Sequence, residues 1–172
     1  MIKNIKNRLV LIGYRGTGKT TVGKKLSQLL EWDYVSIDEL IEEEVGMTIL
    51  NFVSKKGWEE FRKIEKKVIA GLRNVSRAVI DCGGGVVEDE KNMAALVPKS
   101  WVAWVDAEKS DIYQRLQRAG DRPLLEQTDL MMDIEIYYDY RLPLYKKNSD
   151  IYVNSSSDSV EDICVKIMNE IL

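Results

Sequence analysis

Histidine is missing from this chain of 172 residues, and cysteine occurs only twice, at Cys82 and Cys164. Without histidine, Ser-His-Asp and Cys-His nucleophilic catalysis and any histidine-ligated metal site are excluded. The two cysteines form neither a disulfide framework nor a metal-binding pattern, and they suit a reducing cytoplasm. Any acid–base chemistry must therefore use Asp, Glu, Lys, Tyr or Cys.

Long hydrophobic runs are also missing. No apolar stretch approaches the length of about 18 residues that a membrane span needs, so we expect no membrane association. The apolar run near the start lacks a small-residue cleavage site, which favours a strand over a signal peptide. The net charge of -3 gives no electrostatic reason to expect a nucleic-acid partner. A chain of this length and composition is expected to form one domain, residues 1–172.

The hydrophobic pattern predicts an α/β fold. Apolar runs of strand length occupy residues 8–13, 78–82 and 100–106, with a shorter run at 150–153 and a possible fifth at 32–38. Between them, apolar residues recur with helical spacing in four segments, 19–30, 58–73, 110–119 and 158–172. Near-continuous apolar strands that alternate with helices are typical of a doubly wound parallel sheet with helices on both faces.

The segment GYRGTGKT at residues 13–20 matches the phosphate-binding pattern G-x-x-x-x-G-K-[ST]. An apolar strand precedes it and an amphipathic helix follows, as this loop requires. Glycines let backbone N–H groups wrap an anion, Lys19 supplies charge to the β- and γ-phosphates, and Thr20 offers a hydroxyl to Mg²⁺. The expected ATP contacts in this region are Gly13, Gly16, Thr17, Gly18, Lys19, Thr20 and Thr21.

A tight turn capped by Thr17 is the alternative interpretation of this segment, and Arg15, inside it, is expected to face solvent. The chain is short and lacks the N-K-x-D pattern by which GTPases read guanine. A small-molecule or nucleotide kinase therefore fits better than a motor protein or a GTPase.

Five further motifs follow the loop in order: SIDELIEEEVGMTI, GWEEFRKIE, CGGGVV, DRPLL and RLPLY. With the phosphate loop they span almost the whole chain, and the set resembles shikimate kinase. The resemblance implies a five-stranded P-loop fold of the nucleoside monophosphate kinase type with a mobile lid at about 118–128 and substrate-binding helices at about 37–73. It also implies ATP and shikimate as substrates, shikimate 3-phosphate as product and Mg²⁺ as cofactor. We expect a monomer.

The resemblance assigns roles to particular residues. Arg62 and Arg141 match the two arginines that bind the shikimate carboxylate, and guanidinium forks suit that task. Asp38 matches the aspartate that holds the ring hydroxyls and takes the proton of the attacking one. Arg122 matches the lid arginine over the phosphates, and Arg118 is expected to stack on adenine. Backbone from the glycine triplet is expected against the substrate, at Gly83, Gly84 and Gly85.

Several of these residues have simpler interpretations that the sequence leaves open. Arg62 could only pair with Glu65, three residues on. Asp38 could be the N-cap of the helix that begins ELIEEE. Arg122 and Arg141 could be solvated charges, and Phe61 is expected in the core.

The chain also departs from the family pattern. The family places an aspartate of the Mg²⁺ shell two positions before the equivalent of Asp38, where this chain has Ser36. It places a short neutral residue where this chain has Asp81, at the end of an apolar strand, as in a Walker B motif. We hypothesise that the metal-orienting carboxylate has moved from position 36 to Asp81. Trp58 replaces a usual glutamate, and the sequence does not show its role.

Two other functions remain open at this point. One is a related kinase with a different hydroxy-acid acceptor, and the other is a nucleotide-binding homologue that has lost turnover.

Overall fold

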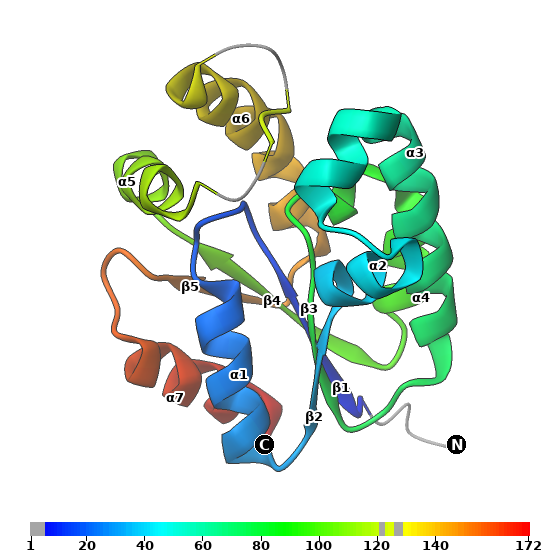
Figure 1. The fold of residues 1–172 in the computed structure, drawn as a ribbon. Coiled ribbons are helices and arrows are strands. Elements are labelled where there is room, and N and C mark those ends of the chain that lie inside the picture. Colours follow the sequence, from blue (N-terminus) through cyan, green and yellow to red (C-terminus); the bar gives the residue numbers. More distant parts are fainter. Residues whose placement is uncertain (1–5, 121–122, 126–128) are drawn as a thin grey trace.

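The structure, a computed structural model, describes residues 6–120, 123–125 and 129–172. At its centre lies a parallel sheet of five strands in the order β2-β3-β1-β4-β5 (Figure 1). The strands are β1 (Arg8–Ile12), β2 (Asp33–Ser36), β3 (Ala78–Asp81), β4 (Ser100–Asp106) and β5 (Ile151–Asn154). The predicted parallel α/β sheet is confirmed, and the possible fifth strand at 32–38 is β2.

The strand order places β1 between β3 and β4. The chain leaves β1 toward one edge of the sheet to form β2 and β3, and later crosses to the other edge for β4 and β5. In doubly wound sheets, ligands bind beyond the carboxyl ends of the strands at such a switch point. The phosphate loop leaves the carboxyl end of β1 at this point.

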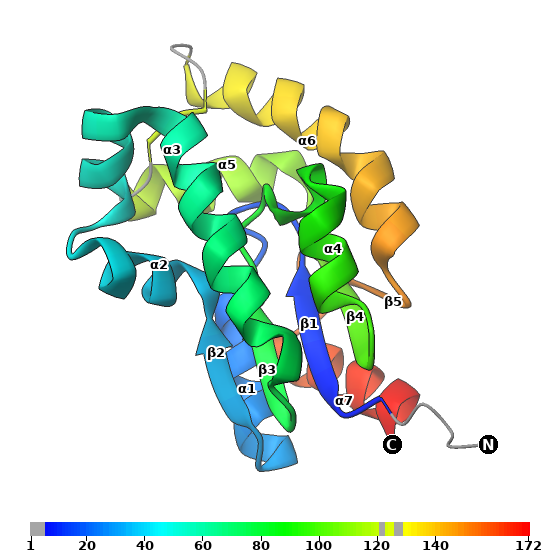
Figure 2. The same cartoon turned by 90° about the vertical axis from the view of Figure 1, so that its right-hand side faces the viewer.

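Helices cover both faces of the sheet (Figures 1 and 2). One face packs on α1 and α7, and the other on the remaining helices. Alternate residues of β1 serve the two faces: Leu9 and Leu11 face α1 and α7, whereas Val10 and Ile12 belong to the opposite core. The helices are α1 (Lys19–Leu30), α2 (Ile37–Val45), α3 (Ile49–Gly71), α4 (Glu90–Leu96), α5 (Lys109–Ala119), α6 (Leu130–Asn148) and α7 (Val160–Ile171), with 3₁₀ turns η1 (Leu72–Asn74) and η2 (Val86–Glu88).

The helix predicted at 58–73 is longer than expected. It begins at Ile49, and Thr48 caps it by accepting a hydrogen bond from the Asn51 N–H. Gly57 interrupts it with φ 81° and ψ 169°, a conformation that favours glycine. The apolar pattern before this kink is out of phase with the pattern after it, which explains why the prediction began at Trp58. The sequence pattern did not predict the bounds of α6, which contains a proline, Pro143, inside the helix.

Arg8 closes the amino end of the sheet as a buried cation. Its guanidinium donates to the Ser100 hydroxyl (2.6 Å) and to carbonyls where α3 and α4 end, those of Leu72 (2.8 Å), Ala95 (2.9 Å) and Leu96 (3.0 Å). These carbonyls are the negative ends of helical turns, which attract a cation. Burial lowers the pKa of Arg8. One side chain therefore fastens two helix ends to β1.

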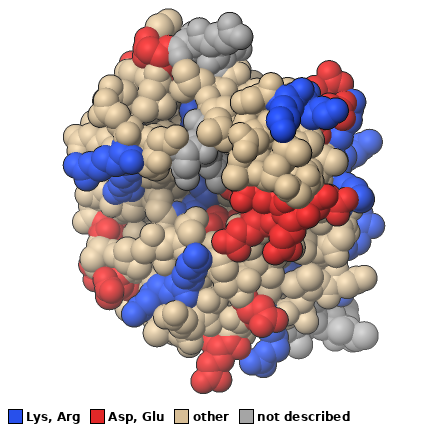
Figure 3. Space-filling view, viewed as in Figure 1, with Lys and Arg blue, Asp and Glu red and all other residues tan. Residues whose placement is uncertain are grey.

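Acidic side chains gather over α2 on the face drawn in Figure 3. Its sequence, IDELIEEEV, places Asp38 and Glu39 in the first turn, where the helix dipole favours negative charge. Within the described residues, no helix has both the length and the apolar character needed to cross a membrane.

Candidate active site

The phosphate loop runs from β1 into the N-terminus of α1. Three of its glycines adopt positive φ angles: Gly13 (144°), Gly16 (78°) and Gly18 (93°). Gly18 is the N-cap residue of α1, and no side chain caps this helix. The Thr17 hydroxyl donates to the carbonyl oxygen of Tyr14 (2.8 Å), so Thr17 does stabilise a turn, as the alternative interpretation expected, but its side chain does not cap α1. The first N–H groups of α1 are thus suited to an anion.

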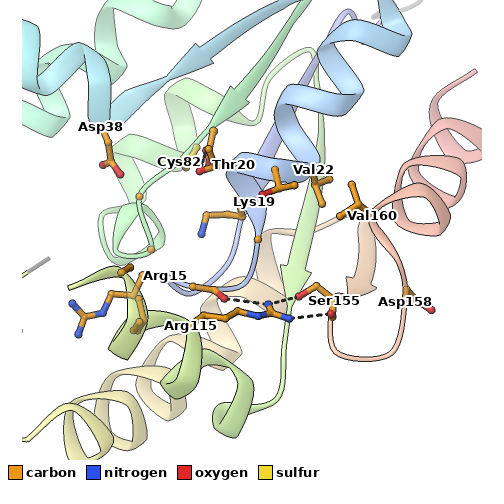
Figure 4. Close-up of a pocket in the computed structure, with 18 residues that line it drawn as sticks. Arg15, Lys19, Thr20, Val22, Asp38, Cys82, Arg115, Ser155, Asp158 and Val160 are labelled. Carbon is orange, nitrogen blue, oxygen red and sulfur yellow. Dashed lines mark hydrogen bonds between the residues drawn. The ribbon is translucent and has the colours of Figure 1, made fainter. Parts of the chain in front are cut away.

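The loop lines a cavity of about 450 Å³ (Figure 4). Lys19 is buried at its edge, and its Nζ donates to the carbonyls of Gly13 (2.9 Å) and Tyr14 (2.8 Å). Thr20 and Thr21 also line this cavity. A cationic amine and a helix N-terminus facing one cavity are suited to a polyphosphate.

Asp81 lies at the end of β3 and accepts two hydroxyl hydrogen bonds on Oδ2. The donors are Thr20 Oγ1 (2.7 Å) and Tyr34 Oη (2.8 Å). Burial and the neighbouring carboxylate of Asp81 raise the pKa of Tyr34, which keeps it a donor. Sequence reasoning missed Tyr34, because a tyrosine in a strand gives no signal of such a contact. The register pairs Ser36 of β2 with Asp81, so both positions of the proposed exchange are adjacent in the sheet.

The donor groups near Thr20 suit Mg²⁺ in particular. The described residues contain no group of three or more His, Cys, Asp or Glu side chains that could hold a metal by themselves. Mg²⁺ in kinases typically uses one or two carboxylates together with substrate phosphates and water. The Thr20 hydroxyl and the Asp81 carboxylate, joined by a hydrogen bond beside the phosphate loop, match that pattern.

Ser36, not Asp38, is the N-cap residue of α2. Its hydroxyl accepts from the Glu39 N–H (3.2 Å). Asp38 lies in the first helical turn, so the interpretation of Asp38 as the N-cap is wrong. Asp38 lines both the larger cavity and a smaller one beside it. Its carboxylate therefore faces the cleft, as a catalytic role requires.

The smaller cavity contains the two arginines expected to bind a carboxylate, Arg62 and Arg141. Arg62 bonds to Glu65 (3.1 and 2.9 Å), as the simpler interpretation required, yet it also lines the cavity. Arg141 is buried rather than solvated, and its Nε donates to Glu88 (2.5 Å). A Glu88 oxygen also lies 4.0 Å from Arg62. Glu88 thus contacts both guanidinium groups from one side, a role that the sequence did not indicate.

Burial changes the ionisation of these partners. It raises the pKa of Glu65, an effect that the Arg62 guanidinium opposes. Burial alone would lower the pKa of Arg141, but nearby Tyr145 and Glu88 reverse this, so that the pKa is raised. Arg141 therefore remains cationic.

The glycine triplet lets backbone pass close to these groups. A Cβ at Gly85 would lie 2.0 Å from Arg62 Nη2, and one at Gly84 would lie 3.2 Å from the Arg15 backbone nitrogen. At Gly83 the nearest atom would be Asp38 Oδ1, at 3.3 Å. At Gly85, a side chain would thus displace the Arg62 guanidinium.

Arg15 does not face solvent, and that prediction is wrong. Its side chain is 8% exposed and forms an ion pair with Asp133 of α6, which is fully buried. Arg15 Nη1 also donates to the Pro123 carbonyl (2.8 Å). The sequence could not indicate this burial, because the acidic partner of Arg15 lies 118 positions away along the chain.

Trp58 contributes to the wall of the smaller cavity. Its indole N–H donates to the Leu124 carbonyl (3.1 Å). Its ring packs edge-on against the Phe61 ring, with 5.2 Å between the ring centroids. Phe61 is buried as expected and lines the same cavity.

The far end of the larger cavity is lined by Arg115 and not by Arg118, which is exposed at the end of α5. Arg115 is held by the Gly16 carbonyl (3.2 Å) and by the Ser155 hydroxyl (2.9 Å) and carbonyl (3.1 Å) (Figure 4). Both arginines lie in one helix, and the sequence alone did not show which of them faces the loop after β5. Arg122, expected over the phosphates, lies outside the described residues.

A phosphate loop at the switch point of a parallel sheet, beside an arginine-lined cavity, defines a P-loop phosphotransferase of the small-kinase type. A sequence model of the shikimate kinase family matches residues 15–172. The chain belongs to the shikimate kinase family.

Individual relatives agree with this assignment. The chain is 37% identical to the shikimate kinase of Thermodesulfovibrio yellowstonii over 162 residues, 94% of this chain and 93% of the relative. It is 33% identical to that of Dehalococcoides mccartyi over 169 residues, 97% and 94% of the two chains. A shikimate kinase of Acinetobacter baumannii, solved in complex with shikimate, superposes with a TM-score of 0.90 at 28% identity, covering 98% of this chain and 94% of that one.

Proposed function

We propose that this chain transfers the γ-phosphoryl group of ATP to the 3-hydroxyl of shikimate. One observation carries the proposal. The cavity at the phosphate loop and the cavity with the two carboxylate-binding arginines adjoin, and both are lined by Arg15, Asp38, Gly83 and Gly84. A nucleotide in one and an anionic ring alcohol in the other would meet at these shared residues.

On the nucleotide side, the loop amides and Lys19 bind the phosphates. The base is expected where the cavity is lined by Arg115, Leu116 and Val160, because a guanidinium plane and apolar side chains suit a flat aromatic ring. Arg118 is exposed and does not line this cavity, so we propose Arg115 in its place. Arg122 keeps its proposed role over the transferring phosphoryl group, by family resemblance.

Thr20 and Asp81 would hold Mg²⁺, which when bound neutralises charge on the β- and γ-phosphates. The hydrogen bond between Thr20 and Asp81 and the pairing of Ser36 with Asp81 in the sheet support the exchange of the carboxylate between strands. Ser36 then serves only as the cap of α2.

On the acceptor side, Arg62 and Arg141 bind the substrate carboxylate with charge-assisted hydrogen bonds. Gly83, Gly84 and Gly85 bring backbone to the ring. Asp38 orients the attacking hydroxyl and accepts its proton, the hydroxyl oxygen forms a bond to the γ-phosphorus, and the bond from that phosphorus to the β–γ bridging oxygen breaks to release ADP. Lys19 neutralises charge that develops on the phosphates. Such a transfer depends mainly on positioning, which two fixed guanidinium groups and one carboxylate provide.

The chain is proposed to act as one domain, residues 1–172, and as a monomer. Residues 37–73 would form the acceptor-binding helices and 118–128 the lid, of which 121–122 and 126–128 lie outside the described residues. Both cysteines are free and buried, which suits the expected cytoplasm.

A coupled assay of ADP release, with and without shikimate, tests the function. We expect strong stimulation by shikimate, and its loss in Asp38→Asn and Arg141→Met. Stimulation by another hydroxy acid in place of shikimate would select a different acceptor. Tight ATP binding without stimulated turnover would select a nucleotide-binding homologue and refute the proposal.

A further inference from the structure

Three consecutive residues, 123–125, are held by side chains from three separate elements. The Pro123 carbonyl accepts from Arg15 of the phosphate loop (2.8 Å), and the Leu124 carbonyl accepts from Trp58 of α3 (3.1 Å). The Leu125 N–H donates to Asp133 Oδ1 of α6 (2.9 Å). Leu125 itself lines the smaller, acceptor-side cavity. The wall of that cavity is therefore tied directly to the phosphate loop.

Arg15 and Asp133 are the centre of this arrangement. Arg15 Nη2 pairs with Asp133 Oδ2 while Nη1 holds Pro123, so the two ends of one planar fork fix two elements. Asp133 uses its other oxygen for Leu125. The backbone nitrogen of Arg15 lies against Gly84, and its side chain lines both cavities. A buried ion pair that only held α6 in place would not need to lie between two ligand cavities.

We propose that Arg15 and Asp133 are positioning residues that couple occupancy of the nucleotide cavity to the shape of the acceptor cavity. The inference rests on the proposed function. Phosphate binding fixes the backbone of the loop that carries Arg15, and the rigid guanidinium passes that orientation to Pro123 and, through Asp133, to Leu125. The nucleotide therefore raises acceptor affinity, and by thermodynamic linkage the acceptor raises nucleotide affinity by the same factor.

The variants separate this coupling from simple stability. Asp133→Asn keeps an acceptor for the Leu125 N–H but removes the charge that pairs with Arg15. Arg15→Lys keeps the charge but lacks the fork needed to hold Asp133 and Pro123 together. Arg15→Met combined with Asp133→Asn removes both charges of this ion pair together, so neither member is left buried without the other, which protects folding. Lys109→Met is the matched control, because it removes another ion pair onto α6, with Asp139 (2.7 Å), away from 123–125.

The first measurement is the dissociation constant of shikimate by calorimetry, with and without MgADP. In the wild type we expect MgADP to tighten binding about tenfold, within the usual range of coupling between sites. Asp133→Asn, Arg15→Lys and the double variant should lose most of this factor, and Lys109→Met should keep it. Wild-type coupling in the first three variants, or none in the wild type, would overturn the proposal.

The second measurement needs no acceptor. Trp58 bonds to Leu124, so its emission, obtained by difference from Trp58→Phe, reports on segment 123–125. MgADP alone should change this emission in the wild type and in Lys109→Met, but not in Asp133→Asn or Arg15→Lys. If shikimate does not bind the wild type at all, the proposed function is wrong, and the Trp58 emission alone then tests the coupling. An equal change of emission on adding MgADP to the wild type and to all variants would refute the coupling.

Discussion

Replacing Asp81 by Asn tests whether the metal-orienting carboxylate has moved to β3. The asparagine keeps the shape of the side chain and an oxygen for the hydroxyls of Thr20 and Tyr34, which lie 2.7 and 2.8 Å from the carboxylate, but it loses the negative charge. Loss of a group that orients a metal ligand typically weakens metal binding about 10–100-fold, or about 1.4–2.7 kcal/mol. We expect the Mg²⁺ concentration for half-maximal activity to rise by that factor and turnover to fall.

The structure also predicts what should not change. Asp81 lines the larger cavity but not the smaller one, so the KM for shikimate should remain near its wild-type value at saturating Mg²⁺. The assay is initial ADP release over a titration of Mg²⁺ at fixed ATP, with a separate shikimate titration.

Position 36 supplies matched controls. Aspartate is as good an N-cap as serine, so Ser36→Asp in the Asp81→Asn background should keep α2 intact and restore much of the Mg²⁺ affinity. Ser36→Ala removes the cap to the Glu39 N–H, which costs about 1 kcal/mol of stability without changing the Mg²⁺ requirement. The reasoning fails if Asp81→Asn shows the wild-type Mg²⁺ requirement and turnover. It also fails if Ser36→Ala raises the Mg²⁺ requirement as much as Asp81→Asn does.

Three further predictions concern the acceptor cavity and stability. Arg62→Lys and Arg141→Lys keep the charge but lose the fork, so each should raise the KM for shikimate by about tenfold or more in steady-state kinetics while the KM for ATP stays unchanged. The pKa of Glu65 is raised in the folded state, which therefore binds the proton of this carboxyl more tightly than the unfolded state does. As pH rises above the ordinary pKa of 4.5, the wild type should lose stability relative to Glu65→Gln, measured by urea unfolding at several pH values. A difference in unfolding free energy that stays constant with pH would contradict this. Arg8→Met leaves buried carbonyls without a donor and should lower the free energy of unfolding by about 3 kcal/mol or more, whereas an unchanged denaturation midpoint would show that these hydrogen bonds contribute nothing.

Local patterns predicted much of the fold and part of the site. Apolar runs and helical spacing located the strands and α1, α5 and α7, because burial on both faces of a parallel sheet leaves a continuous hydrophobic signal. The Gly57 kink and the apolar sequence of α6 obscured the bounds of α3 and α6. The phosphate loop was readable because its chemistry is contained in eight consecutive residues.

By itself, the sequence determined the order of strands and helices and the phosphate loop, and it raised the hypothesis that a carboxylate has moved from position 36 to Asp81. The tertiary structure alone decided that Arg15 is buried against Asp133, that Tyr34 holds Asp81, and that Arg115 rather than Arg118 lines the nucleotide cavity. The first group depends on contacts between neighbours in the chain. The second depends on contacts between residues 40 or more positions apart, whose partners exist only once the sheet has brought their elements together.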